Sequence, residues 1–359
     1  MSTIVAHTQG TLIEARGEHL RFLTPDGLRR ELPLVGVDRV HCYGKVQVTT
    51  QAIHLLSRRG KELVYFSRRG RLRARLIHNP SAGIGMRRQQ YAWENSPQAL
   101  VIAQALIATK IANQRAVLLR AWRSRPELQD EDCLQRLDAL RQDALSADNS
   151  ERLLGLEGTA ARIYFERWAA CCGDAFPWHG RNRRPPKDPL NVLLSLGYTI
   201  LVGDAHAQCE ALGMDAWLGM LHVQRAGTPA LALDMAEPFR PLLVDRVILD
   251  EVSHRRLRPE HFTTDQAGPS QRNPDDLDDA DDAPAVLDAT TTDHHEPLPR
   301  LSDEGFRIYL TALERRLTHE DGDAASNGLR HDLHQQILSL AEALRQGDPA
   351  RFKPHHLRT

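Results

Sequence analysis

Apolar and polar residues alternate along much of residues 1–78, which is the two-residue period of β-strands that bury one face. Leu20 and Phe22 alternate with charged residues, and a Pro-Asp-Gly sequence at 25–27 then turns the chain, which predicts a hairpin. A short helix is expected over residues 51–58, after two threonines that can cap it. The pattern predicts a small β-rich N-terminal domain.

The period changes near residue 79, where an Asn-Pro-Ser sequence marks the domain boundary. From there apolar residues recur every three or four positions, as on the buried face of a helix. The expected fold class is α+β, with the small β-rich domain followed by a larger all-α C-terminal domain, residues 79–359. The helices expected in this domain cover residues 100–117, 134–144, 153–168, 190–212, 231–239, 242–253, 302–317 and 329–346.

One segment of the helical domain differs in composition. Residues 263–299 are rich in Asp, Pro, Thr and Ala, so they bury too little apolar area to offset their ordering entropy, and we expect an acidic disordered insertion. The net charge of the chain is −1, but Asp265 to Glu296 hold ten acidic residues and one basic residue, which leaves +8 elsewhere. A body this basic is compatible with a nucleic-acid partner, although an arginine-rich composition alone is the simpler explanation.

The cysteines, the lengths of the apolar runs and the first residues argue against several classes of protein. The five cysteines are scattered without a C-x-x-C pair, which argues against a disulfide framework and a structural zinc site. No apolar run reaches the roughly 20 residues of a membrane span. The first residues, MSTIVAHTQG, lack the basic and apolar regions of a signal peptide. We expect a cytoplasmic protein with no membrane partner.

Two candidate functional residues stand in otherwise apolar segments. Glu157 lies near the expected start of a helix, in LEGTAARIYF, where small neighbours leave room for a group to approach its carboxylate. A glutamate favoured by the positive end of the helix dipole is the simpler alternative. His222 closes the stretch LGMLH, where a histidine is more often a satisfied core or capping residue than a ligand.

A third segment, LALDMAEPFRP, holds Asp234 and Glu237 three positions apart. On a helix both carboxylates would project from one face, where two like charges repel. Either a metal ion or Arg240, which lies three positions after Glu237, could offset that repulsion. The three segments together supply carboxylates and one imidazole, which suit Mg²⁺ or Mn²⁺. Such an ion can activate an oxygen for phosphoryl chemistry.

These segments together resemble one family, CRISPR-associated protein one, the metal-dependent endonuclease and integrase of CRISPR spacer acquisition. The resemblance runs from residue 1 to about residue 260 and resumes near Leu301. Its matching stretches, in order, are KIANQR at 110–115, EGTAARIYF at 157–165, GRNRRPPKDPLNVLLSLGYTIL at 180–201, LGMLH at 218–222 and LALDMAEPFRP at 231–241.

The resemblance implies roles for individual residues. Glu157, His222 and Glu237 are implied as catalytic ligands of Mg²⁺ or Mn²⁺, although His222 could also transfer a proton. The family often has Asp at the third position, so Glu237 adds one methylene of reach. Asp234 is implied as a residue that supports the site. The expected DNA-binding residues are Arg225, Arg183, Arg184 and Lys187.

The resemblance also implies partners and a reaction. It implies a homodimer, formed through the N-terminal domain, that joins a second small protein, CRISPR-associated protein two, on double-stranded DNA of the protospacer and the CRISPR repeat. The implied reaction is a transesterification in which a DNA 3′-hydroxyl attacks a phosphodiester at the repeat boundary. Two alternatives are a stand-alone nuclease or mobile-element integrase, and an architectural DNA-binding subunit. The acidic insertion departs from the family pattern and could screen the basic face, although a neutral surface insertion is the simpler interpretation.

Overall fold

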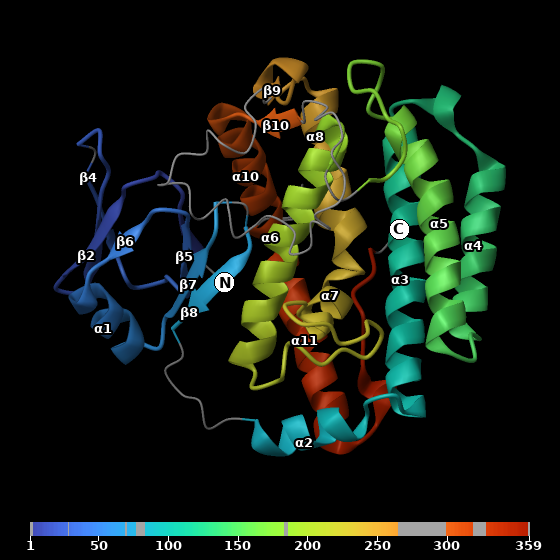
Figure 1. The fold of residues 1–359 in the computed structure, drawn as a ribbon, viewed down its shortest axis with the longest axis horizontal. Coiled ribbons are helices and arrows are strands. Elements are labelled where there is room, and N and C mark those ends of the chain that lie inside the picture. The colour runs from blue at the N-terminus through green and yellow to red at the C-terminus, as the bar shows by residue number, and fades with distance from the viewer. Residues whose placement is uncertain are drawn as a thin grey trace, which may run out of the picture. The chain divides into compact units, whose positions relative to one another are not determined.

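The computed structural model describes residues 3–27, 29–68, 70–76, 83–182, 186–264, 299–318 and 328–357. Its described residues divide into two compact units, the first ending before residue 77 and the second beginning at Gly83 (Figure 1). The boundary predicted at residue 78 lies outside the described residues, as does nearly all of the acidic insertion predicted at 263–299.

The first unit contains two four-stranded sheets and one helix, α1 (Thr50–Arg58). One sheet has the order β1-β5-β7-β8, with parallel pairs up to β7 and an antiparallel pair at β8. The other has the order β4-β3-β2-β6, in which only the pair of β2 and β6 is parallel. The strands are β1 (Thr3–Ala6), β2 (Leu12–Arg16), β3 (His19–Leu23), β4 (Arg29–Pro33), β5 (Arg39–Tyr43), β6 (Gln47–Val48), β7 (Glu62–Phe66) and β8 (Leu72–Arg75).

The predicted hairpin is confirmed as β3 and β4, which pair antiparallel with Leu23 opposite Arg29. Gly27 has a φ of 83°, a left-handed conformation that glycine adopts without strain, so the Pro-Asp-Gly sequence can turn the chain. The helix α1 begins after Thr49, whose side chain accepts a hydrogen bond from the backbone of Ala52 at 3.3 Å.

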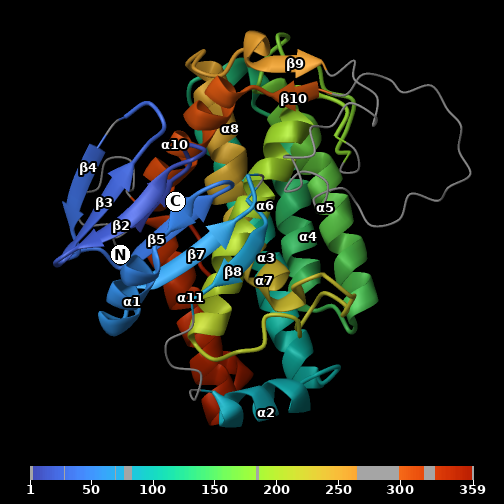
Figure 2. The same ribbon diagram turned by 60° about the vertical axis from the view of Figure 1, so that its left-hand side comes forward.

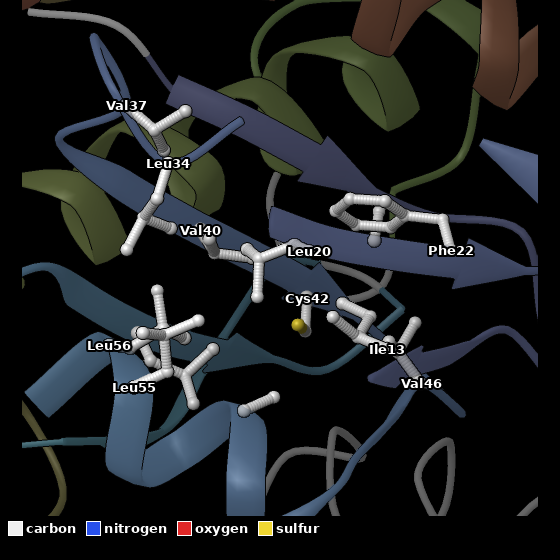
Figure 3. Close-up of a cluster of buried hydrophobic side chains, with 13 residues drawn as sticks. Ile13, Leu20, Phe22, Leu34, Val37, Val40, Cys42, Val46, Leu55 and Leu56 are labelled. Atoms are coloured by element: carbon white, nitrogen blue, oxygen red, sulfur yellow. The ribbon is translucent and has the colours of Figure 1, made fainter. Parts of the chain in front are cut away.

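Both sheets of the first unit and α1 share one hydrophobic core, shown in Figure 3. Alternate residues of the strands point into it, which is why the sequence shows a two-residue period. The buried members are Ala6, Ile13, Leu20, Phe22, Leu34, Val37, Val40, Cys42, Val46, Ala52, Leu55, Leu56 and Leu63.

The second unit is largely helical (Figure 2), which confirms the predicted α+β fold class. One short antiparallel pair, β9 (Phe262–Thr264) with β10 (Pro299–Leu301), interrupts the helices. The helices are α2 (Ile84–Ala92), α3 (Pro97–Trp122), α4 (Glu131–Leu145), α5 (Ser150–Ala170), α6 (Pro189–Ala211), α7 (Ala230–Ala236), α8 (Arg246–Ser253), α10 (Asp303–Thr318) and α11 (Leu329–Gln346). Single 3₁₀ turns span Pro126–Leu128, Pro259–His261 and Pro349–Arg351.

Two long helices organise this unit. The 26-residue α3 packs against both α4 and α5, and it also contacts α7. The helix α6 packs against α7 and α11. It is the one helix among the described residues that is long and apolar enough to cross a membrane, but 72% of its apolar window is buried, as in the core helix of a soluble protein.

The two helices predicted at 231–239 and 242–253 are joined differently from the prediction. The first ends at Ala236, and a π-helical segment, Arg240–Asp245, leads into α8. Pro238 and Pro241 lack the backbone N–H that an α-helix needs, so the chain cannot continue the regular hydrogen-bond pattern here. π-helical turns are frequent at functional sites, and this one begins three residues after Glu237.

Candidate metal centre

Glu157 and Lys110 come together because α5 packs against α3. The side chain of Asn149 caps α5 by accepting a hydrogen bond from the backbone of Arg152 at 2.8 Å. Glu157 lies two turns farther along, and its side chain remains 21% exposed. The ammonium of Lys110 donates a hydrogen bond to Oε1 of Glu157. The carboxylate of Glu157 is therefore held by a buried cation while it stays open to solvent.

Lys110 also reaches a second carboxylate. Its Nζ lies 2.6 Å from Oε2 of Glu237, and the lysine side chain is only 7% exposed. Burial disfavours the charged ammonium, but the charges of Glu157 and Glu237 outweigh burial and raise the pKa of Lys110. Lys110 is therefore a buried cation shared by a carboxylate of α5 and one from the turn that follows α7.

Glu237 follows the last residue of α7 and is almost fully buried. Its Oε1 lies 3.2 Å from the guanidinium of Arg240 and 3.8 Å from Nε2 of His222. Burial opposes its negative charge, but Arg240, Lys110 and His222 outweigh burial and lower the pKa of Glu237 to about 2. Oε2 of Glu237 is paired with the ammonium of Lys110 and has no other hydrogen-bond partner within the described residues.

Asp234, on α7, fixes the loop that carries His222. Its side chain is fully buried and accepts backbone hydrogen bonds from Met220 at 2.5 Å, Leu221 at 3.0 Å and His222 at 3.1 Å. A Cβ atom at Gly219 would lie 2.8 Å from Oδ2 of Asp234, so only glycine allows the loop to approach this closely. The sequence LGMLH therefore folds around one carboxylate.

The same carboxylate orients the imidazole of His222. Oδ1 of Asp234 lies 2.6 Å from Nδ1 of His222, so Nδ1 is the protonated nitrogen and Nε2 faces Glu237. Burial favours the neutral ring, but the hydrogen bond and charge of Asp234 outweigh it and raise the pKa of His222. A carboxylate that holds the second nitrogen of a histidine is the usual arrangement behind a metal-binding imidazole.

Two carboxylates and one imidazole, from Glu157, Glu237 and His222, are chemically suitable ligands for a divalent metal ion. Two ligands that each lie about 2.1 Å from an ion are at most about 4.2 Å apart, so the 3.8 Å between Nε2 of His222 and Oε1 of Glu237 is compatible with a shared ion. The buried Oε2 of Glu237 already contacts one cation, the ammonium of Lys110, and is a further oxygen ligand for a metal ion. As the side chains stand, no three His, Cys, Asp or Glu residues in the described chain are gathered tightly enough to hold a metal, because Lys110 lies between the two glutamates.

A second layer of polar contacts holds the backbone that follows Glu237. Asn113, one turn after Lys110 on α3, donates hydrogen bonds to the carbonyls of Pro238 at 2.8 Å and His355 at 3.0 Å. The ring of His355 stacks on Phe239 with the ring centres 5.3 Å apart. The C-terminal segment is thereby fixed against the turn that carries Glu237.

Beyond Arg240 lies a buried network around Asp245, the last residue of the π-helical segment. The guanidinium of Arg240 lies 4.8 Å from the ring centre of Tyr198, and the hydroxyl of Tyr198 donates to Oδ1 of Asp245 at 2.5 Å. Burial raises the pKa of Asp245 to about 6, although the hydrogen bond from Tyr198 favours the charged form.

The substitution Asp245→Asn tests this network through stability. Because the folded state binds the proton of Asp245 more tightly than the unfolded state does, the stability from this group is complete below about pH 4 and is lost as the pH rises through 6. The rise in the pKa of Asp245 from its ordinary value of 3.8 to about 6 corresponds to a free-energy difference of about 3 kcal/mol. Relative to wild type, the free energy of unfolding of the variant should rise by up to that amount between pH 4 and pH 7.5.

Urea denaturation at both pH values measures this difference, and Asp174→Asn is the matched control because Asp174 is exposed. A variant whose stability relative to wild type is the same at both pH values would show that Asp245 does not titrate in this range.

The residues predicted to bind DNA are only partly placed. Arg225 and Lys187 are both exposed, Arg225 in the loop just after His222 and Lys187 just before α6. The backbone of Lys187 donates to the side chain of Asn182 at 2.7 Å, which fixes its loop. Arg183 and Arg184 lie outside the described residues.

Of the residues that the sequence singled out, the structure brings His222, Glu237 and Asp234 into contact and links Glu157 to Glu237 through Lys110. It adds Lys110 and Asn113, which residue chemistry alone did not identify as site residues. One signal was present in the sequence. Lys110 interrupts the apolar face of the predicted helix next to Ile111, and a lysine on a buried face needs a charged partner.

Comparisons with known proteins identify the family of this chain. A sequence model of the family described as CRISPR associated protein Cas1 matches residues 4–271. A CRISPR-associated endonuclease Cas1 of Rhodospirillum rubrum is 38% identical over 276 residues, which covers 73% of this chain and 79% of the relative.

Solved structures share the whole fold. A chain of a partial Cas6-RT-Cas1–Cas2 complex superposes with a TM-score of 0.72 at 26% identity, covering 100% of this chain and 99% of that chain. A Cas1 protein from Thermotoga maritima gives a TM-score of 0.72 at 21% identity, covering 97% of this chain and 98% of that one. With a family match over more than half of its length, this chain belongs to the CRISPR-associated protein Cas1 family.

Proposed function

We propose that this protein is a divalent-metal-dependent DNA endonuclease and integrase that inserts foreign DNA fragments as new spacers into a CRISPR array. The observation that carries the proposal is that Glu157 and Glu237 share the ammonium of Lys110 while Nε2 of His222 faces Glu237 and Nδ1 of His222 is held by Asp234. Mg²⁺ or Mn²⁺ matches two carboxylates and one imidazole. The names of the relatives, CRISPR-associated endonucleases Cas1, support the same chemistry.

The proposed reaction is a transesterification. The 3′-hydroxyl oxygen of an incoming DNA end bonds to a phosphorus atom at the repeat boundary, and the bond from that phosphorus to the 3′-oxygen of the repeat strand breaks. One phosphodiester replaces another, so the reaction needs no nucleoside triphosphate. The proton leaves the attacking hydroxyl, and a proton returns to the leaving 3′-oxygen.

The residues of this chain have distinct parts in that reaction. Glu157, His222 and Glu237 would hold the ion, which lowers the pKa of a bound hydroxyl and offsets phosphoryl charge when it is present. Asp234 keeps Nε2 of His222 directed at Glu237. The exposed fractions of Glu157 and His222, 21% and 30%, leave the site open to a DNA backbone on their side. Arg225 and Lys187 are proposed to bind phosphates, together with Arg183 and Arg184.

The proposed partners follow from the family. A homodimer formed through the N-terminal domain would join a small protein of the CRISPR-associated protein two family on double-stranded DNA, in the cytoplasm. The solved relatives in complexes that contain Cas2 support this assembly.

An integration assay tests the proposal. Labelled duplex DNA with 3′-hydroxyl ends is incubated with a plasmid that carries a CRISPR repeat, with and without the small partner, in Mn²⁺ or in EDTA. We expect label to join the plasmid only with Mn²⁺, and no joining when the duplex ends in 3′-dideoxynucleotides. Cleavage of branched DNA without the partner, in the absence of any joining, would instead indicate a stand-alone nuclease.

A further inference from the structure

The ammonium of Lys110 stands between the two carboxylates that would hold the metal. It contacts Oε1 of Glu157 and lies 2.6 Å from Oε2 of Glu237. A cation shared by two carboxylates from separate segments of the chain is what a bound divalent ion would provide. Lys110 thus provides, from α3, the counter-charge that brings Glu157 and Glu237 together.

The charges around this position balance without a metal. The two positive charges of Lys110 and Arg240 neutralise the two negative charges of Glu157 and Glu237. The carboxylate of Asp234 is occupied by hydrogen bonds from three backbone N–H groups and the imidazole of His222. A divalent ion added to this set would leave an excess of positive charge at a buried site, where charge is costly. The site therefore disfavours a divalent ion unless a further anion arrives or Lys110 withdraws.

Of the two cations, Lys110 is the one that can withdraw. Its four-carbon side chain carries a compact charge on rotatable bonds, so the ammonium can move while α3 stays in place. Arg240 has less freedom, since its planar guanidinium also lies over the ring of Tyr198.

We propose that Lys110 occupies the divalent-cation position between Glu157 and Glu237 until DNA binds, so that metal and DNA bind cooperatively. This inference rests on the proposed function, because the arriving anion is the DNA phosphodiester. A phosphate offsets the excess positive charge, and by linkage the metal raises the affinity for DNA as much as DNA raises the affinity for metal. Lys110 is then a positioning residue that keeps the site closed to metal in free protein.

Titration of Mn²⁺ tests the inference without any turnover. Free Mn²⁺ is measured by electron paramagnetic resonance in the presence of wild type or variants, with and without a duplex that ends in 3′-dideoxynucleotides. For wild type we expect DNA to tighten Mn²⁺ binding at least about tenfold, within the range of ordinary coupling between sites. For Lys110→Met we expect tight binding without DNA and a smaller effect of DNA.

Three further variants sharpen the result. Lys110→Arg keeps the charge and should restore weak binding in free protein. Lys353→Met removes an exposed lysine of the same unit and should behave as wild type. Lys110→Gln replaces Lys110→Met as the uncharged variant in the Mn²⁺ titration if the Met variant does not fold. Either uncharged variant should melt at a lower temperature in EDTA than in Mn²⁺, because the buried Glu237 and the partly exposed Glu157 then lack their shared cation.

The outcomes separate this inference from the proposed function. Equal Mn²⁺ affinity of wild type with and without DNA would overturn the role of Lys110 and leave the metal site standing. Unchanged affinity in the uncharged variants would also overturn it. If neither wild type nor the variants bind Mn²⁺, even with DNA, both the metal site and the inference fail.

Discussion

Strand transfer by the Glu157→Gln variant is expected to fall by at least about a thousandfold, because the amide no longer supplies the negative charge that helps to hold the ion. The substitution keeps the shape of the side chain, and the amide oxygen can still accept a hydrogen bond from Lys110. The partly exposed position of Glu157 on α5 should tolerate the change without loss of folding. The measurement is joining of labelled duplex to repeat plasmid in Mn²⁺.

Glu166→Gln is the matched control, since Glu166 is exposed on the same helix. DNA binding, followed by fluorescence anisotropy in EDTA, should be unchanged in both variants. Joining at the wild-type rate by Glu157→Gln in Mn²⁺ would remove Glu157 from the site.

For Asp234→Asn we expect a loss of about 10- to 100-fold in both Mn²⁺ affinity and strand transfer, the usual cost of losing the partner behind a metal-binding histidine. The single amide oxygen of asparagine can still accept the backbone hydrogen bonds of Met220 and Leu221, whereas an NH2 group in place of Oδ1 cannot accept those from His222. Its amide group, however, cannot supply the negative charge that fixes Nδ1 of His222 as the protonated nitrogen. Calorimetric titration of Mn²⁺ into variant with DNA present measures the affinity.

Asp143→Asn, an exposed position on α4, is the control for this substitution. Melting curves of both variants should show folded protein. A folded Asp234→Asn variant that binds Mn²⁺ as tightly as wild type would mean that Asp234 serves only the fold of the loop.

Much of the fold could be predicted because the spacing of apolar residues along the chain distinguishes strands from helices. The two-residue alternation around Leu20 and Phe22 reports a sheet with one buried face, and the hairpin they predict is β3 with β4. The longer apolar stripes of the second unit are helices at nearly the predicted bounds, α3 and α6 among them. Local hydrogen bonding decides such elements, so local sequence is enough.

The candidate site was predictable mainly through resemblance to a family. Residue chemistry alone left Glu157, His222 and Glu237 each open to a structural explanation, and only their joint presence in known segments singled them out. Asp234 was expected to support the site, and the structure places it on Nδ1 of His222 while Glu237 faces Nε2. Spacing alone could not assign one carboxylate to each nitrogen.

The roles of Lys110 and Asn113 could not be predicted from the sequence. Lys110 is 47 residues from Glu157 and more than 120 from Glu237, and Asn113 contacts a carbonyl 242 positions away. Such contacts depend on how helices pack, which no short pattern contains. The π-helical segment was missed for a related reason: two prolines signal a break but not the geometry that replaces it.

The central claim, that Glu157, His222 and Glu237 hold a divalent ion, is tested most directly by pulsed electron paramagnetic resonance of bound Mn²⁺. The sample is the protein with a duplex that ends in 3′-dideoxynucleotides. We predict one bound ion whose spectrum shows coupling to an imidazole nitrogen. This coupling should disappear in His222→Gln and persist in His254→Gln, an exposed control on the same unit. A bound ion without nitrogen coupling in wild type, or coupling that survives in His222→Gln, would contradict the claim.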